Sequence, residues 1–280
     1  MKPVVLSGRL QAVASMATVG NRVCDVGCDH GFVPVYLVEQ GISPHVLAMD
    51  VGNGPLSAAR EHVAERGLEP FIETRLSDGL HNYNIGEADT LICAGMGGRL
   101  MMRILSDDRG KTESFRELIL QPQSEIEQFR GWLRRQGYCI TDENMIEEDG
   151  KFYPMMRVRT DAEQQGDRVC GYEEICKELK DRQTSGFEGT AALPDNTCNF
   201  ENNIVLCKLI DRYGPFLLLY KNHTLAAYLK REEKIYREIA DSLQAKGLSD
   251  EKRKNRYAEV MELMGECRMA LEIVISQETT

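Results

Sequence analysis

The chain has 280 residues, 42% of them hydrophobic, and a formal net charge of −10 at pH 7. This composition excludes disorder throughout, and no apolar run reaches the roughly 18 to 20 residues that a membrane-spanning helix needs. Residues 1–15 lack the continuous apolar stretch of a signal peptide, so we expect a soluble, cytoplasmic protein.

Residues 1–160 alternate short apolar runs with helix-like segments, a pattern that is typical of βαβ units around a parallel sheet. In chain order, we expect helices over 6–18, 33–40, 55–66, 99–105 and 125–136, and strands over 22–26, 45–49, 71–76, 90–93, 117–120, 138–146 and 151–159. Ser124 is the predicted cap of the helix at 125–136. Asp149 and Gly150 have the chemistry of a hairpin turn between the last two strands. Five parallel strands followed by a hairpin predict a doubly wound α/β domain over 1–160.

The rest of the chain divides in two. Residues 161–213 are acidic and polar, and we expect an insertion or connector there. Residues 214–280 predict an antiparallel helical hairpin, a coiled coil, because apolar residues recur at heptad spacing. The members of the second seam are Tyr257, Val260, Met264, Cys267, Leu271 and Val274.

The nine cysteines favour reduced thiols over disulfides or a zinc site. Cys24, Cys28, Cys93 and Cys139 fall in or beside predicted strands, where cysteine acts as a small hydrophobic residue. No CxxC pair occurs, so the usual spacing of a structural zinc site is absent and we expect no metal.

The first predicted strand leads into the loop DVGCDHG, Asp25 to Gly31. Glycines are typical of the tight turn where an open α/β sheet binds a nucleotide-like cofactor. A dinucleotide fingerprint would read GxGxxG, whereas this loop reads GxxxG and carries carboxylates at Asp25 and Asp29. Those carboxylates would repel a pyrophosphate but suit a sulfonium cofactor with an ammonium group. We therefore predict S-adenosylmethionine as the cofactor, bound by Asp25, Gly27, Asp29, His30 and Gly31.

Three further strand ends carry candidate site residues. Asp50 ends the second strand, where a carboxylate can accept both ribose hydroxyls. Asp78 and Gly79 follow the third strand, where a carboxylate can meet an adenine amino group. Gly95 lies in the glycine cluster 94–98 after the fourth strand, on the side of the methyl acceptor. An isolated Asp-Gly is most often only a turn, but four strand ends in the correct order favour one site. The fold class is therefore a class I S-adenosylmethionine-dependent methyltransferase (Rossmann-like) domain.

Eight motifs extend this assignment to a family. They are LSGRL (6–10), DVGCDHG (25–31), GP (54–55), DGL (78–80), AGMGG (94–98), LILQPQ (118–123), EEDGKFY (147–153) and GPFLL (214–218). With them, the chain resembles the bacterial tRNA (adenine-22-N1)-methyltransferase family, TrmK. The resemblance implies transfer of a methyl group to N1 of an adenine in the D-arm region of tRNA.

Adenine N1 is a neutral nucleophile, so the reaction needs positioning more than a strong base. Asp29 is our candidate for stabilising the positive charge that develops on the base, with His30 beside it. The alternative for Asp29 is a carboxylate that only orders the loop by bonding to backbone amides. His30 has the same alternative, a loop histidine with a structural hydrogen bond.

The tRNA partner would need a basic path, which the overall charge does not provide. Gly97, Gly98, Arg99 and Arg103 are the predicted substrate contacts beside the glycine cluster. Lys230, Arg231, Lys234 and Arg237 predict a second tRNA contact on the helical hairpin, for which self-association is the competing role. Two other functions stay open: a methyltransferase acting on a small molecule or protein, and a non-catalytic RNA-binding scaffold.

Overall fold

The computed structural model describes residues 3–160, 204–248 and 250–275, and divides the chain into two units, Met1–Gly171 and Tyr172–Thr280. Most of the predicted connector therefore lies outside the described residues. In the described part, no helix has the length and apolar character that crossing a membrane requires.

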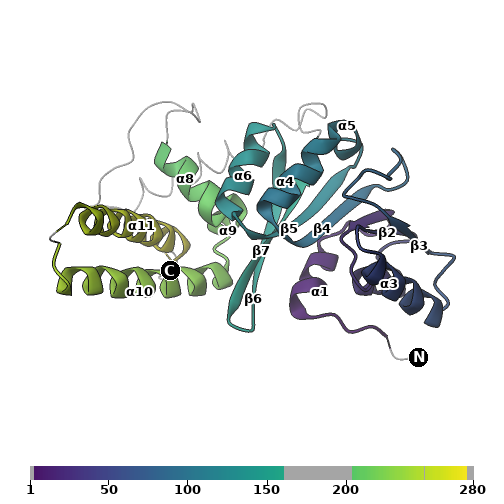
Figure 1. Cartoon of the computed structure of the whole chain (residues 1–280), viewed down its shortest axis with the longest axis horizontal. Helices are drawn as coiled ribbons and strands as arrows, with labels where there is room; N and C mark the ends of the chain where they lie inside the picture. The colour runs from purple at the N-terminus through teal and green to yellow at the C-terminus, as the bar shows by residue number, and fades with distance from the viewer. Residues whose placement is uncertain (1–2, 161–203, 249, 276–280) are drawn as a thin grey trace. The chain divides into compact units, whose positions relative to one another are not determined.

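The first unit is built on a seven-stranded sheet with the order β3-β2-β1-β4-β5-β7-β6 (Figure 1). Its strands are β1 (Val23–Val26), β2 (Val46–Asp50), β3 (Ile72–Leu76), β4 (Thr90–Gly97), β5 (Glu117–Ser124), β6 (Cys139–Glu148) and β7 (Lys151–Arg159). Strands β1 to β5 are parallel, whereas β7 is antiparallel to β5 and β6 is antiparallel to β7. The prediction of five parallel strands and a hairpin is confirmed.

Helices cover both faces of this sheet. The helices are α1 (Gly8–Ser15), α2 (Phe32–Glu39), α3 (Asn53–Glu65), α4 (Gly98–Asp107), α5 (Arg109–Thr112) and α6 (Ile126–Arg135). Contacts link α2 to both α1 and α3 in one layer, and α4 to both α5 and α6 in the other (Figure 1). Chain order reverses between β1 and β4, and a sheet of this type binds its ligand at the carboxyl ends of the strands on either side of such a reversal.

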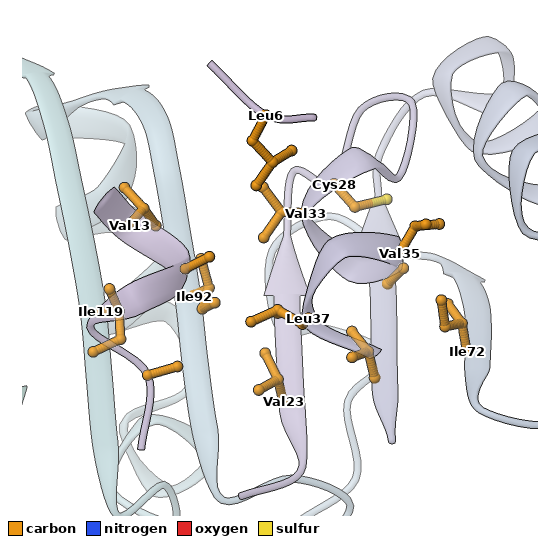
Figure 2. Close-up of a cluster of buried hydrophobic side chains, with 14 of the residues drawn as sticks. Leu6, Val13, Val23, Cys28, Val33, Val35, Leu37, Ile72, Ile92 and Ile119 are labelled. Carbon is orange, nitrogen blue, oxygen red and sulfur yellow. The ribbon is translucent and has the colours of Figure 1, made fainter. Parts of the chain in front are cut away.

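One hydrophobic core lies between the sheet and the layer of α1, α2 and α3 (Figure 2). Val23 and Ile92 extend from the strands toward α1 and α2, and Leu37 of α2 is completely buried among them. The extended segment before α1 adds Leu6, which lies near Val33 in the same cluster. Burial on both faces explains why the central strands read as continuous apolar runs.

Two details of the sheet differ from the prediction. Strands β4 and β5 each continue four residues beyond the apolar run that predicted them, because Gly97 pairs with Ser124 after two register shifts. Ser124 therefore ends β5, and the prediction that it caps the next helix is wrong. The N-cap of α6 is Glu125, which has a left-handed backbone (φ 49°).

The hairpin turn between β6 and β7 is confirmed, since Asp149 (φ 51°) and Gly150 (φ 70°) both have the positive φ of a type I′ turn.

The second unit is helical in its described part. Its helices are α8 (Ile204–Tyr213), α9 (Pro215–Leu219), α10 (His223–Ala245) and α11 (Glu251–Ile275). Helix α8 occupies the last ten residues of the segment that we predicted as a connector. The thiol of Cys267 donates to the carbonyl of Leu229 (3.2 Å) and Arg253 donates to that of Lys246 (3.2 Å), so α10 and α11 pack in opposite directions. Val260, Met264 and Val274 of the predicted seam are buried. A supercoil of the two helices stays a prediction.

Candidate active site

The loop after β1 lies at the reversal point of the sheet and is fixed by its own backbone. The amides of Gly27 and Cys28 donate to the carbonyl of Met49 in β2 (2.8 and 3.0 Å), and Gly31 donates to Cys28 (2.8 Å). Gly27 (φ 78°) and Gly31 (φ 74°) adopt the left-handed conformation that glycine tolerates best. A Cβ on Gly31 would stand 3.0 Å from the Cβ of Ala59 in α3. The glycines therefore let the loop turn tightly into α2.

Asp50 joins the loop to the end of β2. Its Oδ2 accepts a hydrogen bond from the backbone amide of Asp29 (3.1 Å), and its Oδ1 accepts one from Gly52 (2.8 Å). A carboxylate offers about four acceptor positions, so each oxygen keeps capacity for a ligand hydroxyl. Asp50 is thus a support of the loop and a free acceptor at the same time.

Asp29 has a left-handed backbone (φ 49°) and a side chain that is 70% exposed. Its Oδ1 lies 3.6 Å from Nε2 of His30, which is itself 54% exposed. Within the described residues, the carboxylate of Asp29 accepts no backbone amide, whereas the amide of Asp29 is bonded to Asp50. The backbone amide of Asp29 therefore helps to order the loop, whereas the carboxylate of Asp29 is available for another role.

Asp25 is the buried carboxyl of the site. It is 4% exposed and pairs in the sheet with Ala48 of β2 and Ile92 of β4, which are completely buried. Burial, and next the negative charge of Asp50, raise the pKa of Asp25 to about 7. A cation bound beside Asp25 would favour the ionised carboxylate, so this position suits a positively charged ligand.

The raised pKa of Asp25 predicts how stability depends on pH. Between about pH 4 and pH 7 the folded protein keeps a proton that the unfolded chain has released, so stability falls as the pH rises through this window. Below this window Asp25 is protonated in both states, so it does not affect stability. Above the window Asp25 is ionised in both states, and its burial as a carboxylate lowers the free energy of unfolding by up to about 4 kcal/mol. We expect Asp25→Asn to melt several degrees above the cofactor-free wild type at pH 8 and close to it at pH 4, by calorimetry. A difference that does not change with pH would contradict this assignment.

The third strand end contains an ion pair that joins two predicted site residues. Nη2 of Arg103 in α4 lies 2.9 Å from Oδ1 of Asp78, and both side chains are about half exposed. Gly79 (φ 55°) follows, and a Cβ there would meet Ile104 at 3.1 Å. Arg99 is 83% exposed and has Glu125 at 3.5 Å. The predicted basic contacts on α4 are thus each balanced by a carboxylate.

The glycine cluster after β4 divides into two parts. Gly95 (φ 80°) faces polar groups, since a Cβ there would lie 3.5 Å from Nη1 of Arg9. Gly97 and Gly98 instead face β5, where a Cβ on Gly98 would come within 2.6 Å of the carbonyl oxygen of Ser124. Close packing of α4 against β5 therefore accounts for the glycine at 98. Gly95 instead faces the side chains of Arg9 and Gln123.

Arg9, Gln121 and Tyr153 meet beside Gly95, and sequence reasoning gave none of them a role. Nη1 of Arg9 donates to Oε1 of Gln121 (2.8 Å), and the guanidinium lies 5.5 Å from the centre of the Tyr153 ring. The three residues belong to the motifs LSGRL, LILQPQ and EEDGKFY, and their membership of these motifs is the sequence feature that could have marked them as site residues. Their meeting depends on the docking of α1 and the return of β7, which no local pattern reveals.

Comparison with known proteins agrees with this geometry. A family model described as a methyltransferase domain matches residues 6–156. The chain is 36% identical over 175 residues to the tRNA (adenine(22)-N(1))-methyltransferase of Bacillus subtilis strain 168, across 62% of this chain and 71% of that protein. The crystal structure of the B. subtilis M1A22 tRNA methyltransferase TrmK has a TM-score of 0.70 at 27% identity, and the match covers 96% of this chain and 99% of that one.

A second solved structure includes the methyl donor. A Streptococcus pneumoniae protein described as a candidate tRNA (m1A22) methyltransferase, in complex with S-adenosyl-L-methionine, has a TM-score of 0.69 at 26% identity, over 95% of this chain and 100% of that one. The sheet order, the glycine loop with its carboxylates, and these likenesses lead to one conclusion. The chain belongs to the tRNA (adenine(22)-N(1))-methyltransferase family.

Proposed function

We propose that this protein transfers a methyl group from S-adenosylmethionine to N1 of adenine 22 in tRNA. The observation that carries the proposal is the set of carboxylates around the glycine loop, in a chain of this family. Asp25 is buried in β1, Asp50 ends β2, and Asp29 extends from the loop with its carboxylate exposed. We place the activity in the cytoplasm, because tRNA is the substrate.

The residues at the four strand ends fit this cofactor. The buried Asp25 suits a cationic ligand, and the spare acceptor capacity of Asp50 suits two ribose hydroxyls. Gly27, His30, Gly31, Gly79 and Gly95 are the remaining proposed contacts. Asp78 would meet the adenine amino group, and its present partner Arg103 would then share or release it. When bound, S-adenosylmethionine would supply an electrophilic sulfonium methyl group, and in-line attack on its carbon would break the carbon–sulfur bond and release S-adenosylhomocysteine as the leaving group.

The chain itself supplies positioning and charge. Adenine N1 has a free lone pair once the base is unpaired, so no residue has to remove a proton before attack. The base must leave the folded tRNA to enter this site. Backbone carbonyls of the glycine cluster around Gly95 can hold the exocyclic amine, which leaves N1 directed at the methyl group. The carboxylate of Asp29 then stabilises the positive charge that N1 methylation creates on the base.

The second unit is proposed to bind the tRNA body. Of its predicted basic residues, Lys234 lies 4.0 Å from Glu238 and Arg237 lies 2.8 Å from Glu233, so part of that charge is balanced on α10. Self-association of the helices is the alternative role.

Nucleoside mass spectrometry of tRNA incubated with the protein and S-adenosylmethionine tests the function. We expect N1-methyladenosine in wild-type reactions and none when position 22 of the tRNA is not adenine. Formation of N6-methyladenosine instead, or cofactor turnover on a small molecule or protein with unmodified tRNA, would contradict the proposal.

A further inference from the structure

Four separate segments of the chain build a cationic position beside Gly95. Arg9 comes from α1, Gly95 from β4, Gln121 from β5 and Tyr153 from β7. Nη1 of Arg9 donates to Oε1 of Gln121 at 2.8 Å, and the Arg9 guanidinium lies over the Tyr153 ring at 5.5 Å. The same Nη1 stands 3.5 Å from the place of a Cβ on Gly95. The absence of a side chain on Gly95 therefore leaves space next to the guanidinium.

The position of this guanidinium is fixed from both ends. Gln121 is completely buried and pairs with Ala94 across β4 and β5, while its Nε2 donates to the carbonyl of Pro122 (3.2 Å). The backbone amide of Arg9 donates to Oε1 of Glu148 at 3.3 Å, which ties α1 to the end of β6. The side chain is thus held in place before any substrate arrives, which reduces the entropy that binding costs.

The guanidinium of Arg9 forms no ion pair in the described residues, since the carboxylate of Glu148 bonds to the Arg9 backbone amide instead. In the described part of the chain, no carboxylate oxygen lies within 4.0 Å of its guanidinium, and its two supports, Gln121 and Tyr153, are neutral. Arg99 and Arg103 differ, because each has a carboxylate partner. A guanidinium has five N–H donors, of which one is engaged by Gln121, and Arg9 is only partly buried. Arg9 therefore offers a guanidinium without an ion-pair partner and with free N–H donors.

We infer that Arg9 binds the phosphate group of the nucleotide whose base is methylated; this inference rests on the proposed function. A planar guanidinium matches the oxygens of a phosphate with two parallel hydrogen bonds. The methylated adenine is a cation, so an arginine at its reactive edge would oppose the reaction, whereas one on the backbone would not. When a base is extruded from the tRNA fold, the sugar-phosphate backbone of its nucleotide must also be held in place, and contacts to phosphate fix that position.

Arg9→Gln removes the charge and keeps a polar side chain of similar reach. We expect its KM for tRNA to rise about 10- to 100-fold, the loss of one hydrogen-bonded charge contact, with the Kd for S-adenosylmethionine unchanged by calorimetry. The slope of log tRNA affinity against log salt should also become shallower by about 0.7 to 0.9, the value of one phosphate. Arg116→Gln is the control, because Arg116 is 77% exposed and precedes the amino end of β5, away from the carboxyl ends of the strands where the candidate site lies. An unchanged KM and salt slope in Arg9→Gln would overturn the inference.

Gln121→Glu keeps Arg9 and places a carboxylate at the atom that accepts its hydrogen bond. We expect the same loss of tRNA affinity and the same change of salt slope, because the charge of Arg9 is then neutralised within the protein. If Arg9→Gln does not fold, Gln121→Glu by itself tests the phosphate contact. Normal tRNA affinity in a Gln121→Glu protein that binds cofactor would refute that contact. The two proposals fail separately: wild-type protein that makes no N1-methyladenosine contradicts the function, whereas active wild type with unaffected variants contradicts only the role of Arg9.

Discussion

Asp29→Asn is expected to lower the rate of N1-methyladenosine formation by about 100- to 1,000-fold, the usual effect of removing one electrostatic contact to a transition state. The backbone of Asp29 has φ 49°, a region that asparagine and aspartate tolerate better than other side chains. Asparagine therefore preserves the loop and its amide bond to Asp50 while it removes the negative charge. Single-turnover kinetics with saturating cofactor measure this effect on the chemical step.

Binding measurements separate this role from loop ordering. The Kd of Asp29→Asn for S-adenosylmethionine should stay within about threefold of wild type, because the carboxylate of Asp29 accepts no backbone amide in the described residues. Asp107→Asn, a change of an exposed carboxylate at the end of α4, serves as the matched control. Wild-type turnover in Asp29→Asn, or a loss of cofactor affinity as large as the loss of rate, would exclude the assigned role. Replacing His30, 3.6 Å away, by Ala should have the smaller effect.

The fold was predictable from the sequence to the extent that it is encoded locally. The strand end at Asp50 could be located because a buried parallel strand reads as an apolar run, and the turn at Asp149 could be located because type I′ turns select particular residues. Ser124 was misassigned because local capping chemistry favoured a helix start, whereas the pairing of Gly97 with Ser124 extends β5 by tertiary contact. Whether Ser124 caps a helix or extends a strand depends on its pairing with Gly97, and the sequence around Ser124 alone does not reveal that pairing.

The site divides in the same way. Glycines and carboxylates around Asp25 could be proposed from residue type and spacing, but the pairing of Asp78 with Arg103 joins positions 25 residues apart. Arg9 and Gln121 are 112 residues apart, and they meet only because α1 packs on the sheet near β5. Residue chemistry thus predicts the candidate residues at the strand ends, and the three-dimensional structure adds Arg9, Gln121 and Tyr153 beside Gly95.

Asp50→Ala is expected to raise the Kd for S-adenosylmethionine by about 100-fold or more. The substitution removes the proposed acceptor of two ribose hydroxyls and leaves the amides of Asp29 and Gly52 without their partner, and hydrogen bonds to a charged group contribute about 1.5 to 3 kcal/mol each. Titration calorimetry gives the Kd, and amide hydrogen exchange at Asp29 and Gly52 should become faster in the same variant. An unchanged Kd would refute the ribose assignment, even if exchange accelerates.

Asp50→Asn distinguishes the charge of this residue from its shape. Asparagine keeps one acceptor oxygen but turns a donor toward one of the two amides, so we expect a Kd between those of wild type and Asp50→Ala. Because the charge of Asp50 is the second cause of the raised pKa of Asp25, removing it should also lower the pKa of Asp25. The loss of stability with rising pH would then be smaller in Asp50→Asn than in wild type, since less of the Asp25 shift remains. A pH profile identical to wild type would show that the two carboxylates are not coupled, and Asp25 would then owe its pKa to burial alone.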